Sequence, residues 1–94
     1  MKFEWDETKN RSNINKHGIS FQDAVYVFSD PFALSSHDEE HSEEEDRWVL
    51  LGKNLNESLL LVVHTIRSGE VIRLISARKA TKNERSSYTK RLSQ

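Results

Sequence analysis

The sequence contains no cysteine, a single proline and three glycines among its 94 residues. Without cysteine the chain can form neither a disulfide nor a cysteine-ligated zinc site, which suits a reducing compartment. Long apolar runs are also missing, because the longest is LLLVV at 59–63 and roughly 20 apolar residues are needed to cross a bilayer. The opening MKFEWDETK is acidic and aromatic, where a signal peptide would be basic and then apolar. We therefore expect a cytoplasmic protein with no membrane partner.

The short length and the low apolar content, 35%, allow only one small core, so we predict a single domain over residues 1–94. The net charge of −1 hides a division of charge along the chain. Residues 37–46 contain seven carboxylates and no Lys or Arg, whereas residues 78–94 contain six Lys and Arg against one Glu, a balance of +5. A basic C-terminal segment on such a chain indicates an anionic partner, although a solvated helix face would look the same.

Two helices are predicted after a short edge strand at 3–5. Asp6 is a suitable N-cap for a polar helix that ends at Gly18. Ser20 begins the second helix, and Asp30-Pro31 ends it. Four apolar residues of this second helix fall on one face at i, i+3, i+4 and i+7: Phe21, Ala24, Val25 and Phe28.

Three strands are predicted at 47–53, 58–66 and 70–78, with another short strand just after Pro31. Their short connections favour an antiparallel meander, and segment 58–66 is apolar on both faces, which favours a central position. Thr81-x-x-Glu84 is a capping box that starts a final helix. The order predicts an α+β fold in which two N-terminal helices pack on a small, mostly antiparallel sheet, followed by a C-terminal helix.

The string HDEEH at 37–41 matches H-x-x-E-H, a zinc-protease pattern, through His37, Glu40 and His41. Such a site needs a helix that brings both histidines to one face, and the seven nearby carboxylates repel one another and disfavour a helix. We therefore predict an exposed acidic loop between strands, with no metal and no cofactor.

Several segments, in order along nearly the whole chain, resemble the BrnT toxin family. They are FEWD at 3–6, N-x-x-KHG at 13–18 followed by Ile-Ser-Phe, FSDP at 28–31, HS-x-x-E-x-R at 41–47, VVHT at 62–65, and IRLISARKAT at 72–81 with Glu84, Arg85 and Tyr88. The resemblance implies a RelE-like α+β fold and a ribonuclease toxin of a type II toxin–antitoxin pair that stops translation. It also implies a ribbon-helix-helix, BrnA-like antitoxin as partner, and operator DNA bound only through the toxin–antitoxin complex.

RNA cleavage by 2′-OH attack without a metal needs a base, an acid and cations that stabilise the charged phosphorane. Arg78 is the first candidate for the cation, because it lies where a strand ends and a helix begins, and its planar fork fits phosphate. Arg73 is a second candidate. Strict strand alternation would place it opposite Arg78, so either the strand bulges or the two arginines have different roles.

The remaining candidates are weaker. His64 is a potential proton carrier, or a core histidine. Glu45 is the best carboxylate candidate for the acid or the base, or a solvated carboxylate, and Arg47 either pairs with Glu45 or contacts phosphate. Tyr88 either stacks on a base or fills the core. The diffuse candidates for RNA binding, besides Tyr88, are Lys53, Arg67, Lys79, Lys82 and Arg85. The alternative function is a non-catalytic module that binds protein or nucleic acid through its basic C-terminal helix.

Overall fold

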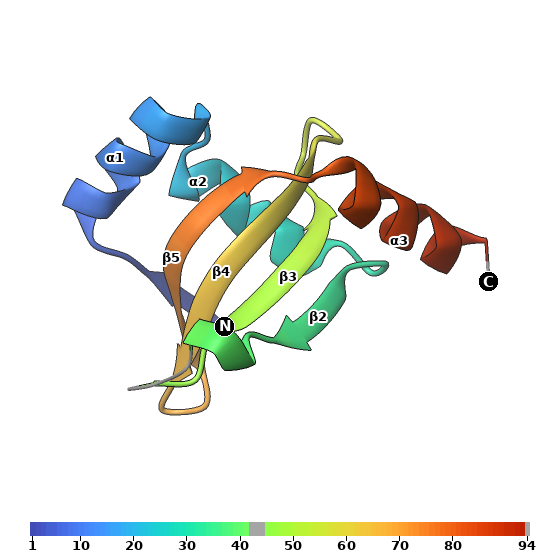
Figure 1. Ribbon diagram of the computed structural model, residues 1–94. Coiled ribbons are helices and arrows are strands. Elements are labelled where there is room, and N and C mark those ends of the chain that lie inside the picture. The colour runs from blue at the N-terminus through green and yellow to red at the C-terminus, as the bar shows by residue number, and fades with distance from the viewer. Residues whose placement is uncertain (42–44, 94) are drawn as a thin grey trace.

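In the computed structural model, which describes residues 1–41 and 45–93, five strands form one mixed sheet in the order β1-β5-β4-β3-β2 (Figure 1). The strands are Lys2–Glu4 (β1), Leu34–His37 (β2), Trp48–Lys53 (β3), Leu59–Arg67 (β4) and Val71–Lys79 (β5). The predicted meander is confirmed, since β3, β4 and β5 pair antiparallel and β4 is central. The first strand was expected at an edge, and it does lie there, parallel to β5.

The helices begin and end largely where their capping residues predict. Helix α1 spans Glu7–His17, with Asp6 accepting two backbone N–H groups at its start and Gly18 in the left-handed region, at φ 72°, at its end. The predicted second helix is shorter than expected: α2 covers Phe21–Ala24, and a 3-10 segment, η1, continues over Val25–Ser29. None of the helices in the described part of the chain is long and apolar enough to cross a membrane.

The main core lies between the sheet and the N-terminal helical segments. Helix α1 packs on β5, and η1 packs behind β3 (Figure 1). The buried residues of this core come from α2, η1, β4 and β5, together with one loop residue: Ile19, Phe21, Ala24, Val27, Leu60, Val62, Ile72, Leu74 and Ala77. One face of the sheet is therefore covered by α1, α2 and η1, and we call the other face the open face.

A buried asparagine joins α1 to the edge of the sheet. The Asn13 side chain accepts the backbone N–H of Ala77 at 3.0 Å and donates to the Ala77 carbonyl at 2.8 Å. It also donates to the carbonyl of Ile19 at 2.8 Å. Because β1 pairs only with residues 71–73 of β5, Asn13 takes the place of a neighbouring strand at Ala77.

Strand β5 contains a bulge that decides which side chains face outward. Val63 of β4 pairs with Ser76, but the next residue, His64, pairs with Leu74, so Ile75 is an extra residue in β5. Leu74 and Ala77 both lie in the core although they are three positions apart, whereas Ile72 and Leu74 alternate normally. Arg73 and Arg78 therefore both project from the open face.

Helix α3, Lys82–Leu92, leaves the sheet at the end of β5 and covers one corner of the open face (Figure 1). It begins with the predicted capping box between Thr81 and Glu84. Tyr88 is buried against Leu51 and Leu59, so this single aromatic residue anchors α3 to the sheet.

Candidate functional site

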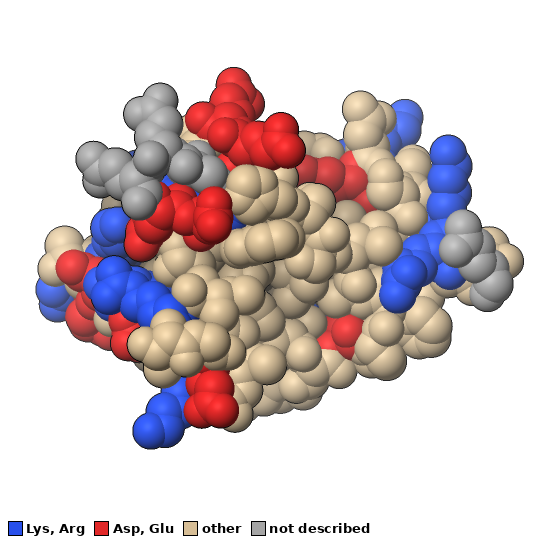
Figure 2. Space-filling view, turned by 90° about the horizontal axis from the view of Figure 1, so that it is seen from below, with Lys and Arg blue, Asp and Glu red and all other residues tan. Residues whose placement is uncertain are grey.

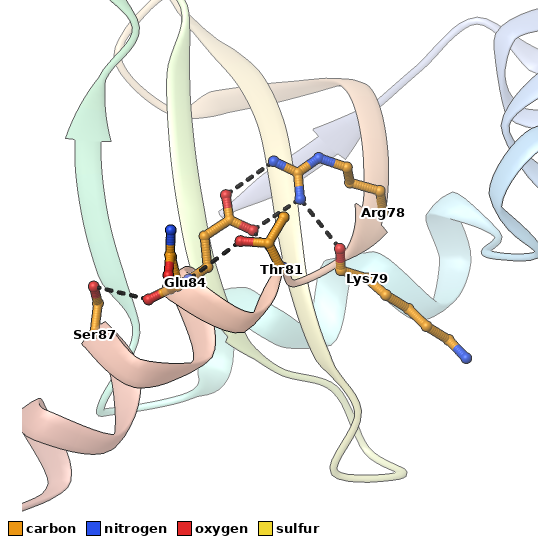
Figure 3. Close-up of polar contacts among 6 residues, drawn as sticks. Arg78, Lys79, Thr81, Glu84 and Ser87 are labelled. Atoms are coloured by element: carbon orange, nitrogen blue, oxygen red, sulfur yellow. Dashed lines mark hydrogen bonds and ion pairs between the residues drawn. The ribbon is translucent and has the colours of Figure 1, made fainter.

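Arg78 lies at the junction of β5 and α3, where Glu84 fixes its side chain (Figure 3). The guanidinium donates to both carboxylate oxygens of Glu84, at 2.8 and 2.9 Å, and to the carbonyl of Lys79 at 3.1 Å. Both side chains of the pair are partly exposed, 36% for Arg78 and 26% for Glu84. The arginine is thus held in one direction while part of its surface remains accessible to an anion.

The pair shifts the ionisation of both groups. The hydrogen bonds from Arg78 lower the pKa of Glu84 to about 2, and the bonds from Thr81 add to this effect. The bonded carboxylate in turn raises the pKa of Arg78. At neutral pH this corner of the open face therefore carries a fixed guanidinium whose charge is balanced by its partner.

A second charged group lies farther along the same face, around Arg73. Arg73 donates to Glu4 of β1 at 2.8 Å, and Arg67 lies 4.0 Å from the same carboxylate. Arg67 also lies 3.9 Å from Glu45. The structure therefore brings together three of the residues predicted from sequence, and it adds Glu4, which sequence reasoning missed.

The remaining candidate of the acidic segment, Arg47, lies directly before β3 and is half-buried. Its carbonyl accepts the backbone N–H of Asp38 at 2.8 Å, which ties the two ends of the acidic segment together. Arg47 is thus near Glu45 in the chain, and its backbone holds the start of β3 beside Asp38.

His64 lies on the other face of the sheet. Its side chain is buried at 4% exposure, its Nδ1 is 3.2 Å from the carbonyl of Val62, and its ring meets Phe28 edge-on at 4.9 Å. Burial lowers its pKa. The structure does not bring His64 together with the arginines, and its surroundings are those of a core histidine.

Tyr88 and the RNA-binding candidates divide into buried and exposed residues. The Tyr88 hydroxyl donates to Asp30, and burial together with this carboxylate raises its pKa to about 12. The Lys53 ammonium lies 5.9 Å from the centre of the Tyr88 ring, a position from which it makes a cation–π contact. The exposed candidates are Arg67 at the end of β4, Lys79 at the end of β5, and Lys82 and Arg85 on α3.

The H-x-x-E-H string does not form a helix. His37 ends β2, and Glu39–His41 form a short 3-10 segment, η2. His37 contacts Asp46 at 3.1 Å, whereas His41 contacts Asp38 at 3.1 Å. The two histidines thus have different partners, and the described residues contain no group of three or more His, Cys, Asp or Glu that could hold a metal. Residues 42–44 of this segment lie outside the described residues.

The division of charge along the sequence appears only in part on the surface of the molecule. In Figure 2, the charged side chains at the right, where α3 ends, are mainly Lys and Arg, whereas at the left Asp and Glu are mixed with other Lys and Arg. The surface between the two ends is mostly tan, with few charged side chains. An elongated anion such as RNA would therefore be favoured toward the α3 end of the molecule.

Sequence reasoning missed two partners of the arginines, Glu4 and Glu84, although Glu84 was predicted as a helix cap. The contact between Glu84 and Arg78 could have been predicted from the position of Glu84, three residues after the N-cap Thr81. A side chain at that position points back toward the N-cap and the strand before it. No comparable signal exists for Glu4, because its strand has three residues and pairs with a segment 69 positions away.

The chain is similar to known proteins in sequence and in fold. Residues 5–84 match the sequence model of the family described as "Ribonuclease toxin, BrnT, of type II toxin-antitoxin system". No curated protein matches the chain. Among solved structures, the chain is similar to the ribonuclease toxin BrnT of Brucella abortus, with 27% identity and a TM-score of 0.64 over 87% of this chain and 99% of that one. The matched span exceeds half of the sequence, and the chain belongs to the BrnT family of ribonuclease toxins of type II toxin–antitoxin systems.

Proposed function

We propose that this protein is a metal-independent endoribonuclease that cuts RNA by 2′-OH attack from the open face of its sheet and thereby inhibits translation. The observation that carries the proposal is the bulge at Ile75, because it brings Arg73 and Arg78 to one face. That face belongs to a chain of a ribonuclease family, and two oriented guanidinium groups suit an RNA backbone.

In this proposal Arg78 holds the scissile phosphate. Glu84 fixes its guanidinium, and a preorganised cation stabilises the charge that develops on the phosphorane. Arg73 and Arg78 are five positions apart, roughly 15 Å along the strand at about 3.3 Å per residue. Arg73 therefore binds a neighbouring phosphate rather than the same one, with Arg67 beside it.

Cleavage needs two proton transfers at the phosphate that Arg78 holds. The 2′-oxygen attacks phosphorus and loses its proton to a base, while the bond to the 5′-oxygen breaks and that oxygen takes up a proton from an acid. The products are a 2′,3′-cyclic phosphate and a 5′-hydroxyl end. Glu45 lies beside Arg67, at the Arg73 end of the face, so it is too far from the phosphate held by Arg78 to take the 2′-OH proton. We propose that Glu45 orients Arg67 and that Arg47 is a further contact to the RNA backbone. His64 has no place in this scheme, since it lies in the core.

The partner in this proposal is a ribbon-helix-helix, BrnA-like antitoxin, with operator DNA bound only by the complex. Membership of a type II toxin–antitoxin family supports an antitoxin partner and an RNA target. The RelE-like character of the fold stays a prediction. Lys53, Lys79, Lys82 and Arg85 would add to the attraction of RNA without specifying a sequence.

The test is cell-free translation with purified wild-type protein, Arg78→Ala and a control, Arg11→Ala, which removes an exposed arginine of α1. New 5′-hydroxyl ends on the message are expected with the wild type and the control, in EDTA as well as without it, and at least a hundredfold fewer with Arg78→Ala. If EDTA abolishes cleavage, the enzyme needs a metal ion and the metal-independent mechanism is wrong. An intact message with the wild type would favour the non-catalytic binding module.

A further inference from the structure

A groove runs between α3 and the open face of the sheet. Its volume is about 330 Å³, at the lower end of the roughly 300–1,000 Å³ common for ligand pockets, a size suited to a single ring system. Its apolar lining comes from three neighbouring strands, through Leu34, Val49 and Leu61. Two serines, Ser36 of β2 and Ser87 of α3, add hydroxyl groups.

The groove opens beside the phosphate-binding arginine. Leu61 is the direct neighbour of Arg78 across the pair of β4 and β5. Glu84 lines the groove and also binds Arg78, so one carboxylate touches both (Figure 3). The negative charge of Glu84 is balanced by Arg78. The groove therefore does not repel a nucleotide whose base enters the groove and whose phosphate lies beside Arg78.

We infer that this groove is the base-specificity site, which receives one unstacked base of the RNA strand whose phosphate is held by Arg78. A base offers apolar faces and a hydrogen-bonding edge, and unstacked bases are bound between apolar side chains while their edges meet polar groups. The aliphatic side chains supply the apolar contact. Ser36 and Ser87 supply the polar edge, and Ser87 donates only a 3.3 Å bond, to the carbonyl of Asn83, so its lone pairs remain acceptors.

This inference rests on the proposed ribonuclease function, and the chain offers a matched pair of variants to separate the two. Ser87 lines the groove, whereas the adjacent exposed Ser86 does not. Ser87→Tyr fills the groove, and Ser86→Tyr adds the same side chain outside it. Ser36→Tyr fills the groove from the opposite wall and guards against a folding defect in α3.

The first measurement maps the 5′ ends produced from one message by each protein. The wild type and Ser86→Tyr should share a base preference at one position next to the cut, and Ser87→Tyr and Ser36→Tyr should lose it and cleave about tenfold less. The second measurement is the affinity for a 2′-O-methyl hexanucleotide, which cannot be cleaved, with an abasic site moved along it. One abasic position should weaken wild-type binding about tenfold, and this effect should vanish in Ser87→Tyr.

The outcomes separate the two proposals. No cleavage by the wild type overturns the ribonuclease function and the base site with it. If the wild type cleaves RNA and both Ser87→Tyr and Ser36→Tyr keep its base preference, the base site is wrong but the ribonuclease function stands. If these variants bind RNA normally but lose affinity for the antitoxin, the groove is a protein-docking surface and the inference is wrong.

Discussion

The carboxylate of Glu84 binds Arg78 through two hydrogen bonds of 2.8 and 2.9 Å, and it also accepts the backbone N–H of Thr81 at 2.8 Å. Glu84 thus has two roles: it completes the capping box of α3, and it orients Arg78, the first candidate for catalysis. The start of the helix and the direction of the arginine are set by one side chain, so a change there has both a structural and a functional effect.

Glu84→Gln separates these effects. Glutamine still suits the third position of a capping box, but it cannot offer Arg78 two charged acceptors. We expect kcat for RNA cleavage to fall roughly 10- to 100-fold, with a smaller change in KM, because a displaced cation loses transition-state contact more than ground-state binding. The measurement is steady-state cleavage of a short RNA.

The control for this change is Glu70→Gln, which removes the same charge at an exposed turn between β4 and β5. It should cleave RNA at the wild-type rate. If Glu84→Gln cleaves as fast as this control, Glu84 serves only as a helix cap and does not position Arg78.

The same pair predicts a dependence of stability on acid pH. The pKa of Glu84 is lowered from 4.5 to about 2, so the pair stabilises the folded state fully above about pH 4.5 and loses this contribution as pH falls toward 2. Since the pair is partly exposed, we expect about 1 kcal/mol. Urea unfolding should show the wild type more stable than Glu84→Gln by that amount at pH 6, and by much less at pH 2.5. If the difference in the free energy of unfolding between the two proteins is the same at pH 6 and pH 2.5, the lowered pKa of Glu84 is contradicted.

Much of this architecture could be predicted from the sequence because its signals are local. Asp6, Gly18 and the capping box at Thr81 mark helix ends through short-range hydrogen bonds, and the structure places them there. The central position of β4 followed from its apolar residues on both faces. The second helix was predicted too long, because Val25–Ser29 keeps a helical apolar pattern but tightens into a 3-10 segment before Asp30.

The candidate site was harder to predict because it depends on contacts between distant segments. Strict alternation would place Arg73 and Arg78 on opposite faces of the sheet. The extra residue at Ile75 brings both side chains to the open face. The sequence allowed a bulge without locating it. The parallel pairing that brings Glu4 to Arg73 likewise joins two segments with no local signal of their register.

His64 is predicted to affect stability rather than cleavage. Burial lowers its pKa below 6.5, so on unfolding below that pH the histidine takes up a proton that the folded protein does not bind, and stability falls as pH drops. The free energy of unfolding of the wild type, relative to His64→Gln, should decrease by about 1 kcal/mol between pH 7.5 and 5.5. The variant should keep RNA cleavage within about twofold. If His64→Gln is folded but no longer cleaves RNA, His64 takes part in catalysis and this prediction is wrong.

Asn13 is predicted to be a major determinant of stability, because its side chain replaces a strand at the edge of β5. Asn13→Ala removes three buried hydrogen bonds and leaves the N–H and carbonyl of Ala77 and the carbonyl of Ile19 without that partner. We expect a loss of about 2–4 kcal/mol in the free energy of unfolding, measured by urea titration. The control is Asn15→Ala, an exposed position of the same helix, where a change within about 0.5 kcal/mol is expected. Equal effects at the two positions would mean that α1 is held by its packing alone.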